Sequence, residues 1–118
     1  EIGPADNAHM SQPKPPPIFS TSEDDPAQTQ TIDRFVVTLA EEVDRLQDAE
    51  LECDFGQLST LATQLGERAQ ALGYLPMARV ASTVARACRE ENLEDARGAM
   101  LELTDTSSRI RRGHRGSA

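Results

Sequence analysis

Apolar residues return at three- and four-residue steps in four separate stretches of this chain of 118 residues. That period places the apolar side chains of each stretch along one face of an α-helix. No stretch shows a two-residue alternation, typical of a half-buried strand, that competes with the helical period. Because short connections separate the stretches, the pattern predicts an all-α protein, an up-and-down four-helix bundle.

The predicted core consists of the residues that form these stripes. They are Ile32, Phe35, Val36, Leu39, Val43 and Leu46 in the first helix; Phe55, Leu58, Leu61, Ala62, Leu65, Ala69 and Leu72 in the second; Met77, Val80, Ala81, Val84 and Cys88 in the third; and Ala96, Ala99, Met100, Leu103 and Ile110 in the fourth.

Helix boundaries are predicted from capping residues, prolines and glycines. An N-cap side chain accepts a hydrogen bond from the first turn, and proline suits that turn because it has no N–H to satisfy. Glycine after a helix can adopt the left-handed conformation that ends it. The predicted starts are Asp25 with Pro26 (first helix, residues 26–50), Asp54, Pro76 and Asn92, and the predicted ends include Gly73 and Gly113.

Composition divides the rest of the chain. Residues 1–9 end in His9, and Met10 follows; because a His-Met pair is common at cloning junctions, we interpret residues 1–9 as a cloning remnant. Residues 10–25 are rich in proline and serine and contain few apolar side chains, so they are expected to form a disordered tail. The folded unit is then residues 26–112, and residues 113–118 form a flexible basic tail.

Charge and cysteine content exclude several classes of function. The net charge is −8, and the acids are concentrated in the first half of the chain, which argues against a nucleic-acid partner. No apolar run reaches the roughly 20 residues that span a bilayer, so no membrane partner is expected. Cys53 and Cys88 form neither a disulfide framework nor a metal-ligand spacing. We therefore expect a cytoplasmic monomer that holds no metal or cofactor.

The second predicted helix carries a recognisable spacing of residues between positions 61 and 74: Leu61, Ala62, Leu65, Ala69 and Gly73. It resembles the active helix of histidine-containing phosphotransfer (Hpt) domains, whose pattern is roughly L-A-H-x-L-K-G-x-A-x-x-x-G. The likeness extends from about Pro17 to Ile110 and includes the Gly73-Tyr74-Leu75-Pro76 turn. The resemblance implies a four-helix bundle of bacterial two-component signalling, in which a histidine exchanges a phosphoryl group with a receiver domain.

Three positions depart from the family pattern. Thr63 stands at the position of the phosphate-accepting histidine, Gly66 at that of the lysine and Glu67 at that of the following glycine. A threonine hydroxyl is a poor nucleophile without an adjacent base. Glu67 adds negative charge one turn from the expected phosphate. The resemblance therefore implies a pseudo-phosphotransferase, not an enzyme.

The surface around Thr63 is the candidate partner site that the resemblance implies. It comprises Ser59, Thr63, Gly66, Glu67 and Gln70, on the side of the second helix away from its core stripe, where Gly66 would let a partner approach the backbone closely. The implied partner is a response-regulator receiver domain or a histidine-kinase component. An ordinary solvated helix face explains the same residues. Two other readings stay open: a helical interaction or dimerisation module outside the phosphorelay, and a phosphotransfer protein with an unusual acceptor.

Overall fold

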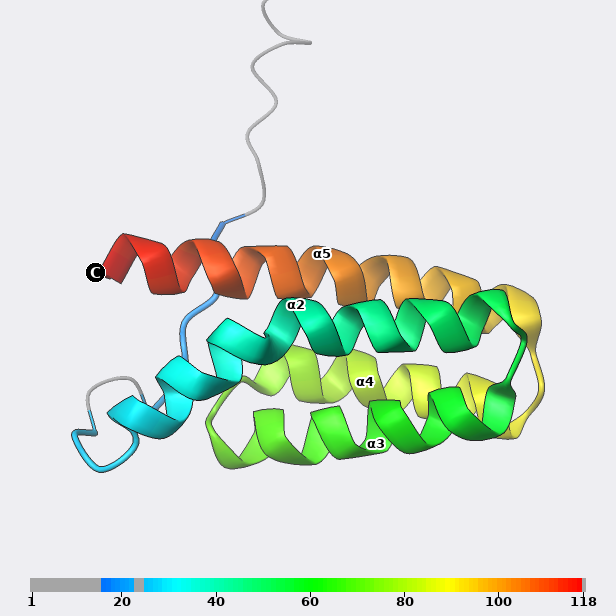
Figure 1. Ribbon diagram of the computed structural model, residues 1–118, viewed down its shortest axis with the longest axis horizontal. Coiled ribbons are helices and arrows are strands. Elements are labelled where there is room, and N and C mark those ends of the chain that lie inside the picture. Colours follow the sequence, from blue (N-terminus) through cyan, green and yellow to red (C-terminus); the bar gives the residue numbers. More distant parts are fainter. Residues whose placement is uncertain (1–15, 23–24, 118) are drawn as a thin grey trace, which may run out of the picture.

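The computed structural model describes residues 16–22 and 25–117. This part of the chain forms four helices and no strand: α2 (Thr29–Leu51), α3 (Phe55–Ala71), α4 (Leu75–Arg89) and α5 (Leu93–Ser117). Each helix runs antiparallel to the one before it, and tight turns join them (Figure 1). The predicted all-α, up-and-down four-helix bundle is confirmed.

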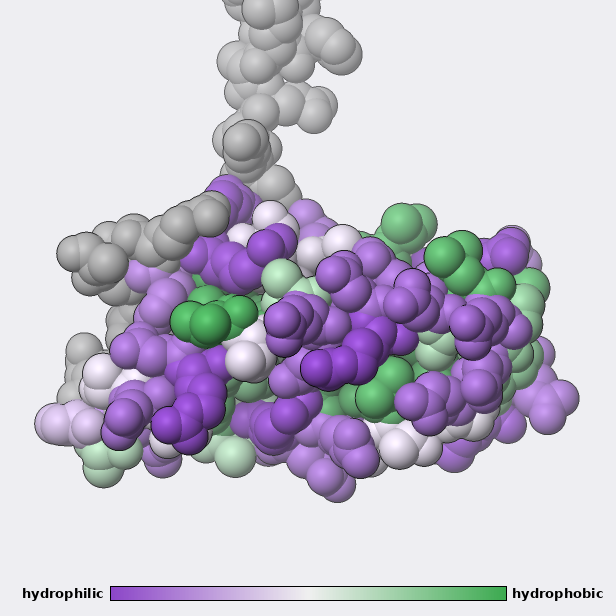
Figure 2. Space-filling model, viewed as in Figure 1, coloured by the Kyte–Doolittle hydropathy of each residue, from purple (hydrophilic) through white to green (hydrophobic). Residues whose placement is uncertain are grey.

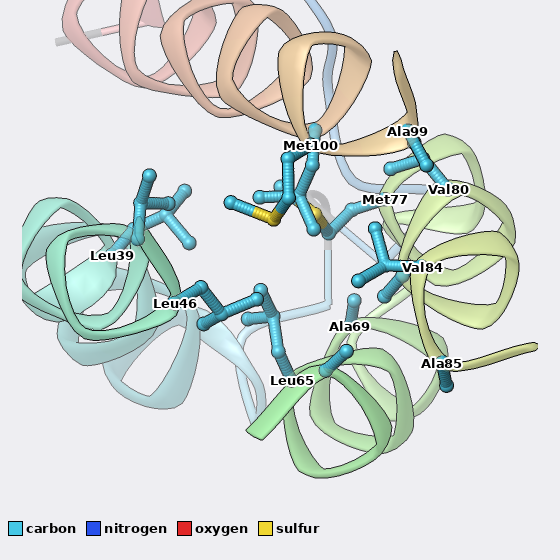
Figure 3. Packing of buried hydrophobic residues seen from close by; sticks show 14 of the residues in the cluster. Leu39, Leu46, Leu65, Ala69, Met77, Val80, Val84, Ala85, Ala99 and Met100 are labelled. Carbon is cyan, nitrogen blue, oxygen red and sulfur yellow. The ribbon is translucent and has the colours of Figure 1, made fainter. Parts of the chain in front are cut away.

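The predicted stripes meet in a single core. All of their residues are buried except Phe55 and Leu61, which are half-buried and pack against the core. Figure 3 shows Leu39 and Leu46 extending from α2 toward the centre of the bundle, where Leu65 of α3 and Met100 of α5 meet them. The helical period of the sequence therefore identifies the buried faces correctly.

Two predicted N-caps are confirmed by their hydrogen bonds. An Asp54 carboxylate oxygen accepts a bond from the Gln57 N–H at 3.1 Å, and the Asn92 side-chain oxygen accepts one from the Asp95 N–H at 3.0 Å. Each bond satisfies a first-turn donor that has no partner inside the helix. These two caps fix where α3 and α5 begin.

The start of α2 differs from its prediction by three residues. The Asp25 carboxylate accepts a bond from the Ala27 N–H at 3.0 Å, and the Gln28 N–H bonds to the Asp25 carbonyl at 2.9 Å. These bonds close a turn over residues 26–28, and the helix begins only at Thr29. Asp25 therefore caps a turn that leads into the helix, not the helix itself.

Only one of the two glycines predicted to end a helix does so. Gly73 has a φ of 82° and follows α3, as expected for a left-handed terminator. Gly113, in contrast, lies inside α5, which continues to Ser117, and it is buried. The prediction that residues 113–118 form a flexible tail is therefore wrong for residues 113–117.

Residues 16–22 form a segment, here named the N-terminal strap, that packs against the bundle. The strap is blue in Figure 1 and passes the C-terminal part of α5. The Ile18 N–H donates to the Arg109 carbonyl at 3.1 Å, the Arg109 Nε donates to the Pro16 carbonyl at 2.8 Å, and the Ile18 side chain is 8% exposed. The strap is thereby fixed to α5.

The second half of the strap contacts the turn between α3 and α4. The Thr21 N–H donates to the Gly73 carbonyl at 3.0 Å, and the Ser20 hydroxyl donates to the Leu72 carbonyl at the end of α3. The predicted disordered tail is thus wrong over residues 16–22, because backbone hydrogen bonds and one buried isoleucine hold this segment. The predicted cloning remnant and residues 10–15 lie outside the described residues.

Candidate docking site

A shallow groove of about 450 Å³ runs between α3 and α4. It brings together four of the five predicted site residues with residues of α4 that the sequence did not indicate. Its lining is Ala62, Thr63, Gly66, Glu67 and Gln70 from α3 and Ala78, Ser82, Ala85 and Arg89 from α4. Ser59, the fifth predicted residue, is half-buried one turn before Thr63 and does not line the groove.

Small side chains make the groove because they let α3 and α4 pack closely. A Cβ at Gly66 would lie 3.3 Å from the Ala81 Cβ and 3.7 Å from the Ala78 carbonyl oxygen. Gly66 was predicted to let a partner approach the α3 backbone closely. In the structure, it is α4 that makes this close approach. A larger residue at position 66 would press the two helices apart before it reached any partner.

Thr63 presents an exposed hydroxyl one helical turn before Glu67. Thr63 makes no side-chain hydrogen bond to any described residue, and none joins it to Glu67. His114 is instead engaged near the start of α2, where its Nε2 lies 3.1 Å from the Asp33 Oδ1. The Glu67 carboxylate lies on the same wall of the groove and is not hydrogen-bonded to the Thr63 hydroxyl.

Arg89 is the charged residue among the four α4 groove residues that sequence reasoning missed. It lies at the end of α4, is exposed, and forms no salt bridge with a described residue. Its spacing from Ala78, Ser82 and Ala85 follows one side of α4, but only the register between α3 and α4 shows that this side faces Thr63. The guanidinium supplies the groove with a positive charge that can meet an acidic group.

Other reactive groups do not add a second site to this region. Burial raises the pKa of the Cys88 thiol, and the neighbouring Arg89 partly opposes that shift. The higher pKa leaves less of the nucleophilic thiolate. Within the described ranges, no three His, Cys, Asp or Glu side chains gather as they would around a metal ion.

Two further findings do not concern the groove. No helix in the described part has both the length and the apolar character needed to cross a membrane. Comparison of the chain with protein-family models, curated proteins and solved structures finds no match in any of the three.

Proposed function

We infer that this protein is a non-catalytic, Hpt-like binding domain that docks a receiver domain of a two-component system. The observation that carries the proposal is the groove between α3 and α4, which places Thr63, the residue at the family's histidine position, on an exposed and sterically open surface. The four-helix bundle and the spacing of Leu61, Ala62, Leu65 and Ala69 on α3 support it further.

The groove suits a docking role because its small side chains leave space on either side of Thr63. Arg89 of α4 and Glu67 of α3 offer charges of opposite sign to a partner. Such charges favour one orientation of the docked protein and slow the association of wrong partners. Bound in this way, the domain would act by occupying a receiver surface that a phosphotransfer-competent partner needs.

The binding test uses substitutions that fill the groove without entering the α3–α4 contact. Thr63→Arg and Ser82→Arg change exposed residues on opposite walls, whereas Gln64→Arg places the same side chain on α3 outside the groove. We expect the two groove variants to weaken receiver binding by at least about tenfold, equivalent to about 1.4 kcal/mol, in a calorimetric titration. The Gln64→Arg variant should bind like the parent. Equal affinities for all three variants would exclude this groove as the docking site.

The absence of phosphotransfer is tested with the same receiver. Incubation with the labelled phospho-receiver should leave the chain unlabelled, because Thr63 stands in place of the histidine and its hydroxyl is not hydrogen-bonded to a base among the described residues. Acid-labile phosphate on the chain would contradict the non-catalytic assignment. A dimer that buries Thr63, detected by light scattering and lost in Thr63→Arg, would favour the dimerisation module instead.

A further inference from the structure

A second groove, of about 460 Å³, lies between α2 and α3 on the side of α3 away from Thr63. Its lining is Thr31, Arg34, Phe35, Thr38, Glu41, Glu42 and Arg45 from α2 and Arg68, Ala71 and Leu72 from α3. Phe35 and Leu72 supply buried apolar surface, and the Phe35 ring stacks on Tyr74 with centroids 5.4 Å apart. The floor of the groove is therefore apolar, and the stacking of Phe35 on Tyr74 fixes its position.

One carboxylate in this groove is already satisfied inside the molecule. Glu42 is 8% exposed and forms a salt bridge with Arg68, whereas the Thr38 hydroxyl donates to the Arg34 carbonyl at 3.0 Å. The Glu42 charge is thus neutralised by Arg68. A ligand in the groove would meet the charges that remain on the α2 rim.

Those remaining charges are Arg34, Glu41 and Arg45, and none of them forms a salt bridge with a described residue. They follow the rim in the order positive, negative, positive. Arg34 and Arg45 are eleven residues apart, so they lie on the same face of α2 and about 16 Å apart along its axis. Such a separation is too large for one phosphate or one carboxylate to bridge.

Figure 2 looks onto the side of the molecule where α2 and α3 lie one above the other. Hydrophilic side chains, drawn in purple, cover much of both helices, and smaller hydrophobic areas, drawn in green, appear among them. An elongated ligand with a narrow apolar stripe and charges on its edge fits such a surface better than a flat apolar partner does.

We propose that the α2–α3 groove binds an amphipathic helix of a protein partner whose edge charges are acidic, basic and acidic, matched to Arg34, Glu41 and Arg45. A helix repeats its faces every three to four residues, so acids about eleven positions apart would meet the two arginines. Apolar residues between them would pack on the exposed Ala71 and over the edges of Phe35 and Leu72. The charge order sets the register of the bound helix and excludes helices of the opposite pattern.

The experiment uses two synthetic helical peptides of about 18 residues that share one apolar stripe. The matched peptide carries Glu, Lys and Glu at the three edge positions, and the reversed peptide carries Lys, Glu and Lys. Fluorescence anisotropy with the full chain should show the matched peptide binding at least about tenfold more tightly than the reversed one. Amide NMR should place the shifts on α2 and α3.

Charge reversal in the protein provides the decisive comparison. Arg34 and Arg45 are exposed, so Arg34→Glu/Arg45→Glu is expected to keep the fold and to abolish or invert the preference between the peptides. Arg79→Glu/Arg86→Glu makes the same change of charge on exposed residues of α4 and should leave the preference intact. Undetectable binding of the matched peptide, equal binding of both peptides, or a preference that survives Arg34→Glu/Arg45→Glu would overturn the proposal. So would displacement of the matched peptide by decanoate, which would indicate a small amphipathic anion as the occupant.

Discussion

At the scale of single residues, Gly98 and Gly113 of α5 show that the cost of one added methyl group depends on its surroundings. A Cβ at Gly98 would have no neighbour within 4 Å, whereas a Cβ at Gly113 would lie 2.5 Å from the Ile18 carbonyl oxygen of the strap. Gly113 is therefore the position that lets the strap lie directly on α5. Gly98 is only a weak point in the helix.

We predict opposite effects for the same substitution at these two glycines. Gly98→Ala should raise the free energy of unfolding by about 0.5–1 kcal/mol, because alanine has the higher helix propensity. Gly113→Ala should be at least about 1 kcal/mol less stable than Gly98→Ala, because its methyl group displaces Ile18 and cancels the gain in propensity. Urea denaturation of the two variants measures the difference. Equal stabilisation by both would show that the strap does not contact Gly113.

At the scale of the elements, the pair formed by Glu42 and Arg68 joins α2 to α3. The Glu42 side chain is 11% exposed and that of Arg68 is 51% exposed, so the carboxylate is the buried partner. Removing the guanidinium would leave a buried acceptor without its charged donor, which costs more than the net contribution of the pair. The pair formed by Arg97 and Glu50 is longer, 4.0 Å, and its arginine is 61% exposed.

We predict that Arg68→Leu lowers the free energy of unfolding by about 1–3 kcal/mol. Arg97→Leu, the matched control, should change it by less than about 0.5 kcal/mol, because exposed pairs contribute little. The double variant Glu42→Leu/Arg68→Leu should recover part of the loss, since it removes the unpaired carboxylate. Thermal and urea unfolding provide the comparison. A similar loss in the two single variants would show that Glu42 does not need Arg68.

The elements that sequence reasoning predicted well depend on local interactions. The starts at Asp54 and Asn92 follow from hydrogen bonds within one turn, and the buried faces follow from the helical period. The predicted end of α5 at Gly113 was wrong because Ile18, which is far away in the sequence, packs against Gly113 and buries it. A glycine ends a helix only where nothing distant stabilises its helical conformation.

In the candidate docking site, too, the features set by one helix were predictable and those set by the packing of two helices were not. Thr63, Glu67 and Gln70 share a side of α3 by periodicity alone, and the structure does place them in one groove. The contact of Gly66 with Ala81 and the position of Arg89 depend on how α4 is aligned with α3. Neither helix contains that alignment in its own sequence, so these two features could not be predicted from it.

At the scale of the whole molecule, the bundle is asymmetric around α3. Short side chains such as Ala69 and Ala85 mark the α3–α4 side in Figure 3, whereas leucines from α2 cross the wider space on the other side. Close packing on one side leaves a shallow groove with small side chains in its walls, and wider packing leaves a groove lined by three arginines and two glutamates. The two grooves thus differ in shape and charge although one helix borders both.

The strap adds a contact at the end of the bundle that no single helix supplies. It connects the last turns of α5 to the turn between α3 and α4, through Ile18 on one side and Thr21 on the other. The strap carries few apolar residues, and for that reason composition alone assigned it to a disordered tail. Burial of Ile18 and the hydrogen bonds to Gly73 and Arg109 make it part of the folded unit.

We predict that truncation will locate the true start of the domain. A chain that begins at Pro16 keeps every described contact and should melt within about 2 °C of the parent. A chain that begins at Glu23 loses the burial of Ile18, worth about 1.5–3 kcal/mol, and should melt at least about 6 °C lower. Ile18→Asp in the untruncated 118-residue chain should reproduce most of this loss, because a carboxylate cannot be buried there without a partner. If the two truncated chains melt together and Ile18→Asp is neutral, the bundle is complete without its strap.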